Sequence, residues 1–341
     1  MKGKTMQLSI IVPVYNMAAD QKLEYCLNSL VNQTLQDYEI IAVDDASTDE
    51  SLTILKRYES MYPEKIRVLA LPENHRQGGA KNAGLKAAQG DFIGFMDSDD
   101  WAAPDMFSKL LDRAYETGAD MVGCDCCLTD RHSMEIGQVI QTSRLDQVGE
   151  LGDRAYKSMI MDAGYLVVKI YRRRLFMEPP LYFPEHMFYE DSAISAELLL
   201  RAKHYEYVQE PLYYYYQHSA STVHVVTEER CLDRMEAMRI MLRLAKESGT
   251  LERYPDEVEF RFINLFYQNT LFSYMQGIQK INLSFLRALG REMKETFPDF
   301  QKNPYYLKRV NEEERMFMEL LIRSPLAFLF YYKLKYFVRG L

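Results

Sequence analysis

Four short apolar runs, each followed by a segment of helical periodicity, dominate the amino-terminal part of the chain. The runs cover residues 8–14, 38–43, 66–71 and 92–96. The β-branched apolar run 8–14 is typical of a strand that is buried on both faces of a parallel sheet. The alternation of strand and helix favours right-handed crossovers between neighbouring parallel strands. The sequence therefore predicts an α/β fold with a mostly parallel sheet that is flanked by helices.

The segments between and after these runs complete the predicted pattern. Segment 72–84 is polar and rich in glycine, and it is predicted as a loop that leads into a helix carrying Leu85, Ala87 and Ala88. The periodicity predicts helices over 104–117, over 154–161 and from Glu190, and strands over 119–127, 166–171, 205–208 and 212–216.

From Thr227 onward the sequence is helical in period and is broken only near three prolines, Pro255, Pro298 and Pro325. We therefore expect two domains, a sheet-containing domain over 1–225 and a helical region over 226–341.

Composition excludes several classes of function. The 341 residues include 41 lysines and arginines and 49 aspartates and glutamates, so the net charge is −8 and we expect no nucleic-acid partner. The five cysteines lack the spacing of a zinc site, which favours reduced thiols in a cytoplasmic protein. We see no secretory leader and no apolar run of about 18 residues, so any membrane contact is expected to be peripheral.

Three carboxylates crowd the end of the fourth apolar run. In the stretch GDFIGFMDSDDWAAP, Asp97, Asp99 and Asp100 follow side chains that suit a buried strand. Like charges a few Å apart repel one another, so such a cluster favours the arrival of a cation. Oxygen ligands suit a hard divalent ion that also holds substrate phosphates, namely Mn²⁺ or Mg²⁺. We predict a metal site at these three residues, the alternative being an acidic loop in water.

The ends of the first two runs carry groups that complement a nucleoside. Pro13, Tyr15 and Asn16 offer a turn and an aromatic face for a base, while Asp44 and Asp45 offer acceptors for a base N–H or a ribose hydroxyl. Taken singly, paired aspartates are often helix N-caps and a lone tyrosine is more often part of a core. Because ligands bind at the carboxyl ends of parallel strands, their joint appearance there predicts a nucleoside site.

The polar segment 72–84 supplies cations for phosphates. Arg76 and Lys81 carry the charge, and Gly78 and Gly79 would let the backbone approach a phosphate group. Together with the predicted metal, these groups make a nucleoside diphosphate the expected ligand.

The motifs LSIIVPVYN, IIAVDDASTDES, AKNAGLKAAQG and DFIGFMDSDDWAAPD resemble, in this order, those of the family 2 glycosyltransferases. The resemblance covers about residues 6–225 and implies the GT-A fold, which is Rossmann-like, followed here by a helical C-terminal extension. It also implies that Pro13, Tyr15 and Asp45 contact the nucleoside and that Asp97 and Asp99 contact the metal and the ribose.

The segment FYEDSAISAELL resembles the Glu-Asp motif of the same family. The resemblance implies that Asp191 is the catalytic base, with Glu190 as the alternative, and a carboxylate in reach of a hydroxyl suits that role. A simpler role for Asp191 is to cap the helix that follows. Where many members have Ala-Arg-Asn, this chain has Ala80-Lys81-Asn82, so the planar fork of arginine is missing from position 81.

Three further residues are candidates. Ser98 and Trp101 lie within the acidic motif and are included at the nucleotide-sugar site, although a buried anchor is the simpler role for Trp101. His218 follows the segment PLYYYYQ and is a candidate metal ligand, the alternative being an ordinary surface histidine.

The resemblance implies a metal-dependent, inverting transfer of a hexosyl or N-acetylhexosaminyl group. The donor is expected to be a UDP-sugar, and the acceptor a hydroxyl of a glycan or lipid-linked molecule in bacterial cell-surface polysaccharide synthesis. The alternative is a GT-A-like subunit that has lost catalysis and serves in binding or scaffolding. A glycine-rich phosphate loop after the first strand is missing, which argues against a nucleotidyltransferase or a dinucleotide-dependent oxidoreductase.

The carboxyl-terminal segment 323–341 is apolar with interleaved lysine and arginine. It is predicted as a helix that lies on the cytoplasmic face of the inner membrane. The alternative is that it packs against the protein, either within its own domain or in a homodimer.

Overall fold

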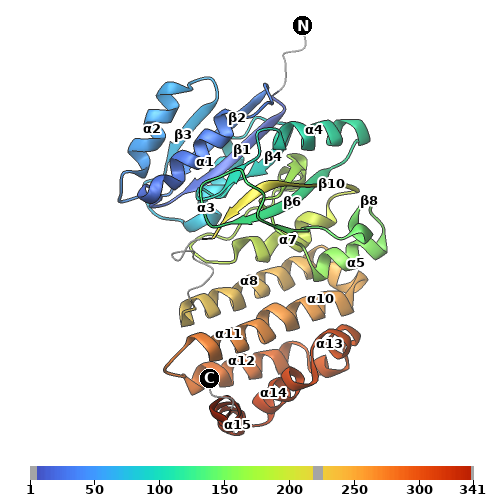
Figure 1. Ribbon diagram of the computed structural model, residues 1–341. Coiled ribbons are helices and arrows are strands. Elements are labelled where there is room, and N and C mark those ends of the chain that lie inside the picture. The colour runs from blue at the N-terminus through green and yellow to red at the C-terminus, as the bar shows by residue number, and fades with distance from the viewer. Residues whose placement is uncertain (1–5, 218–225, 339–341) are drawn as a thin grey trace. The chain divides into compact units, whose positions relative to one another are not determined.

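The structure is a computed structural model that describes residues 6–217 and 226–338 (Figure 1). The chain divides into two compact units. The first consists of residues 1–159 and 163–221, and the second of residues 160–162 and 222–341.

The first unit contains strands and helices in alternation (Figure 1). Its strands are β1 (Leu8–Val14), β2 (Tyr38–Asp44), β3 (Ile66–Ala70), β4 (Phe92–Phe95), β5 (Trp101–Ala102), β6 (Met121–Thr129), β7 (Gln138–Ile140), β8 (Gly149–Glu150), β9 (Lys169–Arg172) and β10 (His204–Tyr216). The helices that begin in it are α1 (Lys22–Val31), α2 (Ser51–Met61), α3 (Arg76–Ala87), α4 (Met106–Thr117), α5 (Asp153–Met161), α6 (Arg174–Met177) and α7 (Glu190–Leu200).

In the described part of the chain, these strands form one sheet of ten strands. The main path runs β3-β2-β1-β4-β9-β6-β10-β5, with β7 beside β6 and β8 beside β10. The pairs β3–β2, β2–β1, β1–β4 and β6–β10 are parallel. Strand β9 lies antiparallel between β4 and β6. The predicted α/β fold with helices around a mostly parallel core of strands is thereby confirmed.

Three local predictions differ from the structure. Segment 72–84 is helical from Arg76 onward, so the predicted loop is much shorter than expected. The two strands predicted around Pro211 form the single strand β10, whose register with β6 shifts on either side of that proline. The strand predicted over 166–171 begins at Lys169 and is antiparallel to its neighbours.

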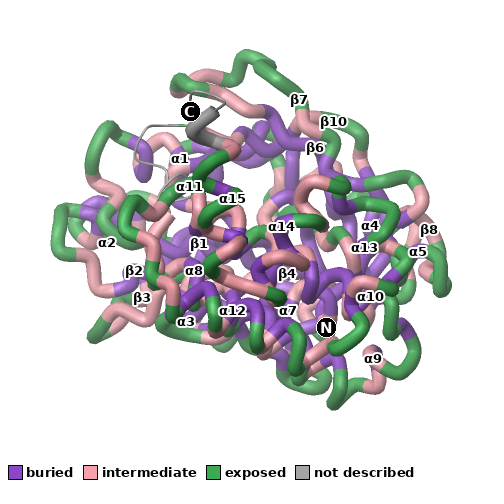
Figure 2. The backbone as a smooth tube through the Cα atoms, turned by 90° about the horizontal axis from the view of Figure 1, so that it is seen from below, coloured by how far each residue is buried: buried purple, intermediate pink, exposed green. Residues whose placement is uncertain are grey.

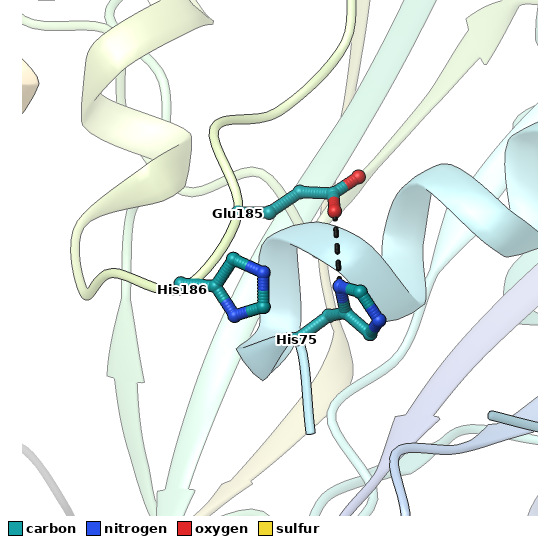
Figure 3. Close-up of side chains that lie close together, drawn as sticks. All are labelled: His75, Glu185 and His186. Atoms are coloured by element: carbon teal, nitrogen blue, oxygen red, sulfur yellow. Dashed lines mark hydrogen bonds and ion pairs between the residues drawn. The ribbon is translucent and has the colours of Figure 1, made fainter. Parts of the chain in front are cut away.

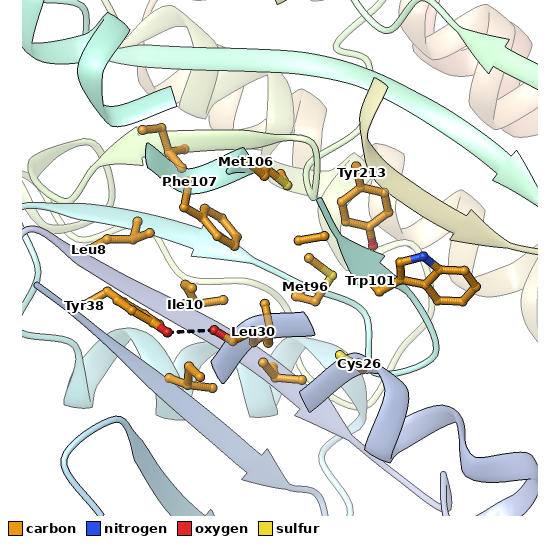
Figure 4. Close-up of a cluster of buried hydrophobic side chains, with 14 of the residues drawn as sticks. Leu8, Ile10, Cys26, Leu30, Tyr38, Met96, Trp101, Met106, Phe107 and Tyr213 are labelled. Carbon is orange, nitrogen blue, oxygen red and sulfur yellow. Dashed lines mark hydrogen bonds between the residues drawn. The ribbon is translucent and has the colours of Figure 1, made fainter. Parts of the chain in front are cut away.

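The core of the first unit lies between the sheet and helices α1 and α4. Strands β1 and β4 are buried along their whole length, and their residues are coloured as buried in Figure 2. Figure 4 shows part of this core, which includes Leu8, Ile10, Phe107 and a buried tyrosine, Tyr38. The Tyr38 hydroxyl donates a hydrogen bond of 2.8 Å to the carbonyl of Leu30, which satisfies the one polar atom that this side chain buries.

A buried polar network joins the starts of β1, β2 and β4. The hydroxyl of Ser9 donates to Oε1 of Glu39 at 2.6 Å and accepts from the backbone N–H of Gly90 at 2.8 Å. The backbone N–H of Gln89 donates to the same Glu39 oxygen at 2.8 Å. Because every member has a partner, the network fixes the entry of β4 beside β1.

The second unit is helical. After the short segment 160–162 it contains α8 (Glu228–Glu247), α9 (Thr250–Arg253), α10 (Pro255–Phe262), a π-helical stretch (Ile263–Asn269), α11 (Thr270–Gly277), α12 (Leu283–Thr296), α13 (Pro304–Arg309), α14 (Glu312–Arg323) and α15 (Pro325–Val338). Side chains of Thr227, Asn282 and Asn311 cap the starts of α8, α12 and α14 by accepting backbone N–H groups. A paired bond of 2.6 and 2.7 Å from Arg239 to Glu292 joins α8 to α12.

Helix α15 packs on α14 through one face. Phe328 and Tyr332 are buried against Phe317 of α14, with ring centroids 5.9 and 5.3 Å away. Leu326 and Phe330 are exposed to 61% and 64%. None of the helices in the described ranges combines the length and the apolar composition needed to cross a membrane.

Gly90 should not tolerate a side chain. A Cβ atom there would lie 2.5 Å from the backbone nitrogen of Ser9 and 2.6 Å from the backbone carbon of Leu8, which cannot move without displacing β1. We expect Gly90→Ala to lower the free energy of unfolding by about 1–3 kcal/mol, as measured by chemical denaturation. Gly152→Ala is the control, because a Cβ at Gly152 meets no atom within 4 Å. Equal stability of the two variants would contradict the prediction.

Candidate active site

The predicted site residues lie at the carboxyl ends of β1, β2 and β4, which are neighbouring parallel strands. Tyr15 follows β1, Asp44 is the last residue of β2, and Asp97 lies two residues after the end of β4. Parallel pairing brings these three strand ends to the same edge of the sheet. The structure therefore brings the predicted nucleoside residues and the predicted acidic cluster together at one edge.

Asp44 and Asp45 are buried, and one carboxylate oxygen of each residue accepts no hydrogen bond from the described residues. Both side chains are 2% exposed, and Oδ1 of Asp44 and Oδ2 of Asp45 have no hydrogen-bond partner. Their other oxygens accept backbone N–H groups, Oδ2 of Asp44 from Ser47 at 3.2 Å and Oδ1 of Asp45 from His75 at 2.8 Å. Burial raises the pKa of Asp45, and the neighbouring Asp44 carboxylate adds to the increase. A buried acceptor without a donor suits a site that a ligand completes.

The loop after β1 is held to the loop after β2. Oδ1 of Asn16 accepts the backbone N–H of Thr48 at 2.8 Å, and the backbone N–H of Asn16 donates to Oγ of Ser47 at 3.0 Å. Asn16 adopts a φ of 53°, a conformation that asparagine tolerates better than most residues. Pro13 is buried in β1, whereas the Tyr15 ring is 45% exposed beside this loop. Asn16 thus acts as a brace between loops, and Tyr15 is the accessible aromatic face.

Asp100 is fixed by protein groups on both oxygens. Its side chain is fully buried, Oδ2 accepts the hydroxyl of Tyr213 at 2.6 Å, and Oδ1 accepts the backbone N–H of Tyr216 at 2.8 Å. Burial raises the pKa of Asp100 well above its usual value, and the charges of Asp99 and Asp97 act in the same direction. This environment favours a role for Asp100 in anchoring the acidic motif to β10. The carboxylates that remain half-buried are Asp97 and Asp99.

Asp97 lies in a shared electrostatic environment with residues from α3 and α7. Burial is the main cause that raises the pKa of Asp97 to about 7, and the Lys81 ammonium opposes the increase in part. The carboxylates of Asp99, Glu190 and Asp191 raise the pKa of Asp97 further. The structure thus brings the acidic motif, Lys81 and the Glu-Asp motif together, although they are up to about a hundred residues apart in sequence.

Lys81 forms a buried ion pair with Glu190. Nζ of Lys81 lies 2.6 Å from Oε1 of Glu190, and the two side chains are 4% and 8% exposed. Nζ also donates to Oε1 of Gln77 at 3.0 Å. Burial by itself lowers the pKa of Lys81, but Glu190 and the neighbouring aspartates outweigh it and raise the pKa. Lys81 therefore stays charged and is paired with Glu190, and it lies in α3, whereas the sequence predicted a loop here.

The glycines of α3 serve close packing. A Cβ atom at Gly78 would lie 2.0 Å from the carbonyl oxygen of Pro184, and one at Gly79 would lie 2.2 Å from Cβ of His75. These contacts explain why a helix forms through a glycine-rich segment of low helix propensity, because tertiary packing outweighs the local preference. They also give Gly78 and Gly79 a role that does not involve a phosphate group.

Asp191 is the second residue of α7, and the N-cap position of this helix belongs to Tyr189, so Asp191 is not the helix cap that was the simpler prediction. The preceding Tyr189 has a φ of 63°, and Oδ1 of Asp191 accepts the backbone N–H of Ser192 at 2.6 Å. Asp191 is half-buried, whereas Glu190 is buried and paired with Lys81. A negative charge at this helix N-terminus is electrostatically favourable.

The remaining candidates differ in their surroundings. Trp101 is fully buried and its Nε1 donates to the carbonyl of Ser133 at 3.1 Å, as expected for an anchor (Figure 4). Ser98 is 4% exposed. The guanidinium of Arg76 lies 4.1 Å from the centroid of the Phe188 ring. His218 lies outside the described residues.

The acidic motif does not form a preassembled cage for a divalent ion. Among the described residues, the one group of three His, Cys, Asp or Glu ligand atoms within 4.8 Å of one another is formed by His75, Glu185 and His186. Asp97 and Asp99 do not belong to such a group of three close ligand atoms. This fits an ion that takes most of its ligands from water and substrate phosphates, as Mg²⁺ does. The donor set is therefore compatible with Mn²⁺ or Mg²⁺ delivered together with a diphosphate.

Sequence reasoning missed two features of this region. Tyr213 lies in a run of four tyrosines, so its contact with Asp100 could not be distinguished from core packing. The grouping of His75 with Glu185 and His186 joins residues about 110 positions apart, and neither histidine lies in a motif that marks it. Only the position of Glu185 and His186 shortly before the Glu-Asp motif could have drawn attention to them.

Comparison with known proteins agrees with this arrangement. Residues 9–178 match the family described as Glycosyl transferase family 2. The chain is 31% identical over 225 residues to the uncharacterized glycosyltransferase YibD of Escherichia coli, covering 65% of this chain and 64% of YibD. It is 30% identical over 213 residues to the poly(ribitol-phosphate) beta-glucosyltransferase of Bacillus spizizenii, covering 62% of this chain but 32% of that protein.

The fold resembles that of a solved structure, S. aureus TarS residues 1–349 in complex with UDP-GlcNAc. The TM-score is 0.66 and the sequences are 21% identical, with 94% of this chain and 92% of that chain covered. At this identity the likeness concerns the fold, which is the GT-A fold. From the matched family, its relatives and its fold, the chain belongs to the family 2 glycosyltransferases.

Proposed function

We propose that this protein is an inverting glycosyltransferase that moves a sugar from a UDP-sugar to a hydroxyl group of an acceptor. The observation that carries the proposal is the 2.6 Å ion pair between Lys81 and Glu190, which holds the Glu-Asp motif beside α3. The charges of Lys81, Glu190 and Asp191 all act on Asp97, so the acidic motif lies next to this pair. A donor-binding carboxylate and a base must lie close to the same reacting carbon. Their shared environment supports that arrangement.

The nucleoside half of the donor is assigned to the ends of β1 and β2. The unsatisfied oxygens of Asp44 and Asp45 are acceptors for the imide N–H of uracil and for a ribose hydroxyl. The exposed ring of Tyr15 offers a stacking surface beside them. The UDP-GlcNAc complex of TarS, a protein of the same fold, supports a uridine donor.

Asp97 and Asp99 are the residues that would hold a divalent metal ion. When bound, the ion would supply charge stabilisation for the departing diphosphate. A role of Asp100 as a third ligand stays a prediction, and its two oxygens accept hydrogen bonds from Tyr213 and Tyr216 that anchor the motif to β10. A role of His218 as a ligand stays a prediction.

Asp191 is the proposed general base. It would accept the proton of the acceptor hydroxyl as that oxygen attacks the anomeric carbon from the side opposite the diphosphate. Glu190 is less suited, because its carboxylate is buried and paired with Lys81. The role of the Lys81–Glu190 pair is to hold α7, and with it Asp191, at the edge of the sheet.

The acceptor is proposed to be a glycan or lipid-linked molecule of cell-surface polysaccharide synthesis, as the poly(ribitol-phosphate) transferase relative supports. The alternative proposal, a catalytically inactive binding or scaffold subunit, is less favoured because Asp97, Asp99 and Asp191 are all present. Turnover of the donor distinguishes the two.

Replacing the base should abolish transfer and leave donor binding intact. We expect Asp191→Asn to lower the rate of UDP release from UDP-GlcNAc with Mn²⁺ at least a hundredfold, the lower limit for general base catalysis. The thermal shift caused by UDP and Mn²⁺ should stay that of the wild type. Glu197→Gln, on the same helix but paired with Arg201, is the matched control and should stay active. Unchanged release by Asp191→Asn would rule out the base assignment.

The raised pKa of Asp97 predicts a pH-dependent stability. Between the ordinary pKa of 3.8 and the folded value of about 7, the folded chain keeps a proton that the unfolded chain has lost. The contribution of Asp97 to the free energy of unfolding therefore falls as pH rises through that interval. In urea titrations without divalent ions, Asp97→Asn should lose less stability than the wild type between about pH 5 and 8. Parallel curves would contradict the shift.

The exposed face of α15 is proposed to contact an anionic membrane surface. Leu326, Phe330 and Leu334 are exposed on it, and Lys333 lies among them. Phe330→Glu should reduce cosedimentation with phosphatidylglycerol-containing vesicles. Leu307→Glu is the control, since Leu307 is 51% exposed on α13. Equal vesicle binding by both variants, or dimers without vesicles that Phe330→Glu dissociates, would contradict the membrane contact and favour a homodimer.

A further inference from the structure

His75, Glu185 and His186 gather at the start of α3 in a way that neither the donor site nor the proposed base requires. His75 precedes α3, and the other two residues lie on the segment that leads to α7 (Figure 3). One ligand atom from each residue lies within 4.8 Å of the other two. Two imidazoles and one carboxylate are a ligand set typical of zinc sites that keep one position open.

We propose that His75, Glu185 and His186 bind a transition-metal ion, with Zn²⁺ as the ion that the ligand set suits best. The proposal concerns a site separate from Asp97 and Asp99. It stands whether or not the proposed transfer reaction is correct.

The ligand atoms are already oriented by neighbouring side chains. Nδ1 of His75 lies 3.1 Å from Oε2 of Glu185 (Figure 3). Nε2 of His75 lies 3.6 Å from Oε1 of Glu73. The amide of Asn82 donates to the second oxygen of Glu185 at 3.0 Å. Metal-bound histidines commonly direct their other ring nitrogen to a carboxylate, and metal-bound carboxylates commonly accept a further hydrogen bond. Glu73 and Asn82 are placed to supply both.

The backbone around the cluster is also fixed, at a conformational cost. The N–H of His186 donates to the carbonyl of His75 at 3.0 Å, which ties the two histidines together. His186 adopts a φ of 59° and Arg76 a φ of 58°, a region that non-glycine residues seldom occupy. Gly79 leaves room for the His75 side chain, since a Cβ there would lie 2.2 Å from that of His75. Strain retained at adjoining positions is characteristic of binding sites.

The distances allow tetrahedral coordination after small side-chain rotations. Bonds of about 2.0–2.2 Å to zinc place tetrahedral ligand atoms roughly 3.3–3.6 Å apart. The His75–Glu185 edge, at 3.1 Å, already has about this length. His186 and Glu185 are exposed, so their side chains can close the remaining gap and an ion can enter from solvent. The ring centroids of the two histidines are 4.6 Å apart.

An ion bound here would join the start of α3 to the segment that positions the Glu-Asp motif. Glu185 precedes Glu190 by five residues, and Arg76 already contacts Phe188 of this segment at 4.1 Å. Zinc would thus add a third link to the Lys81–Glu190 pair and the Arg76–Phe188 contact. Its expected effect is to order segment 184–189.

Zinc titration of the full chain tests the proposal. In isothermal titration calorimetry after metal removal, we expect the wild type to bind Zn²⁺, and His75→Asn and His186→Asn each to weaken the affinity at least about tenfold. Co²⁺ should give a visible absorption band typical of four-coordinate sites in the wild type, and this band should be lost in both variants. Glu185→Gln is a third variant, to be used if a histidine replacement impairs folding. Thermal melts of each variant in EDTA show whether it folds without metal.

Two controls separate this site from others. His204→Asn should bind Zn²⁺ like the wild type, because His204 also lies near two carboxylates, Glu150 and Glu206, without belonging to the cluster. Asp99→Asn should also bind like the wild type, whatever its effect on donor turnover. Wild-type affinity in His75→Asn and His186→Asn would overturn the proposal, as would loss of Zn²⁺ binding in Asp99→Asn.

Discussion

The buried ion pair between Lys81 and Glu190 is the interaction on which the candidate site depends. The two charges are 2.6 Å apart and almost fully removed from water, so neither is tolerable without the other. Because one belongs to α3 and the other to the first turn of α7, their attraction fixes the distance between the two helices. Asp97 shares the same electrostatic environment, and its proton affinity reflects the balance of the whole group. The carboxylates that are proposed to hold the donor and the proposed base are therefore positioned by charge as well as by packing.

Much of the fold could be predicted from the sequence because a strand that is buried on both faces requires a run of mostly apolar residues. Residues Leu8–Val14 and Tyr38–Asp44 are mostly apolar, and both are buried along their whole length. The positions of Asp44, Asp45 and Asp97 at strand ends followed from the same pattern. Their gathering at one edge required only the rule that parallel strands point the same way.

What could not be predicted depends on contacts between distant segments. The sequence did not predict that α3 starts at Arg76, because Gly78 and Gly79 have low helix propensity. These glycines are needed for close packing against Pro184 and His75, and local propensity does not include such contacts. Asp99 and Asp100 are adjacent and chemically identical, yet Tyr213 and Tyr216 hold only Asp100 through both oxygens. The antiparallel insertion of β9 between β4 and β6 likewise depends on pairing that no local period reveals.

The Tyr213–Asp100 hydrogen bond also affects the order in which the chain folds. The two residues are 113 positions apart, and the Lys81–Glu190 pair spans 109. During synthesis, β1 to β4 emerge long before either partner, so a nascent chain can pair its first four strands while the acidic motif still lacks its anchor. Contacts of such sequence separation form late in folding, since the cost of closing long loops comes first. The proposed donor site is thus complete only when β10 has joined the sheet, which makes the completed site a marker of a completed first unit.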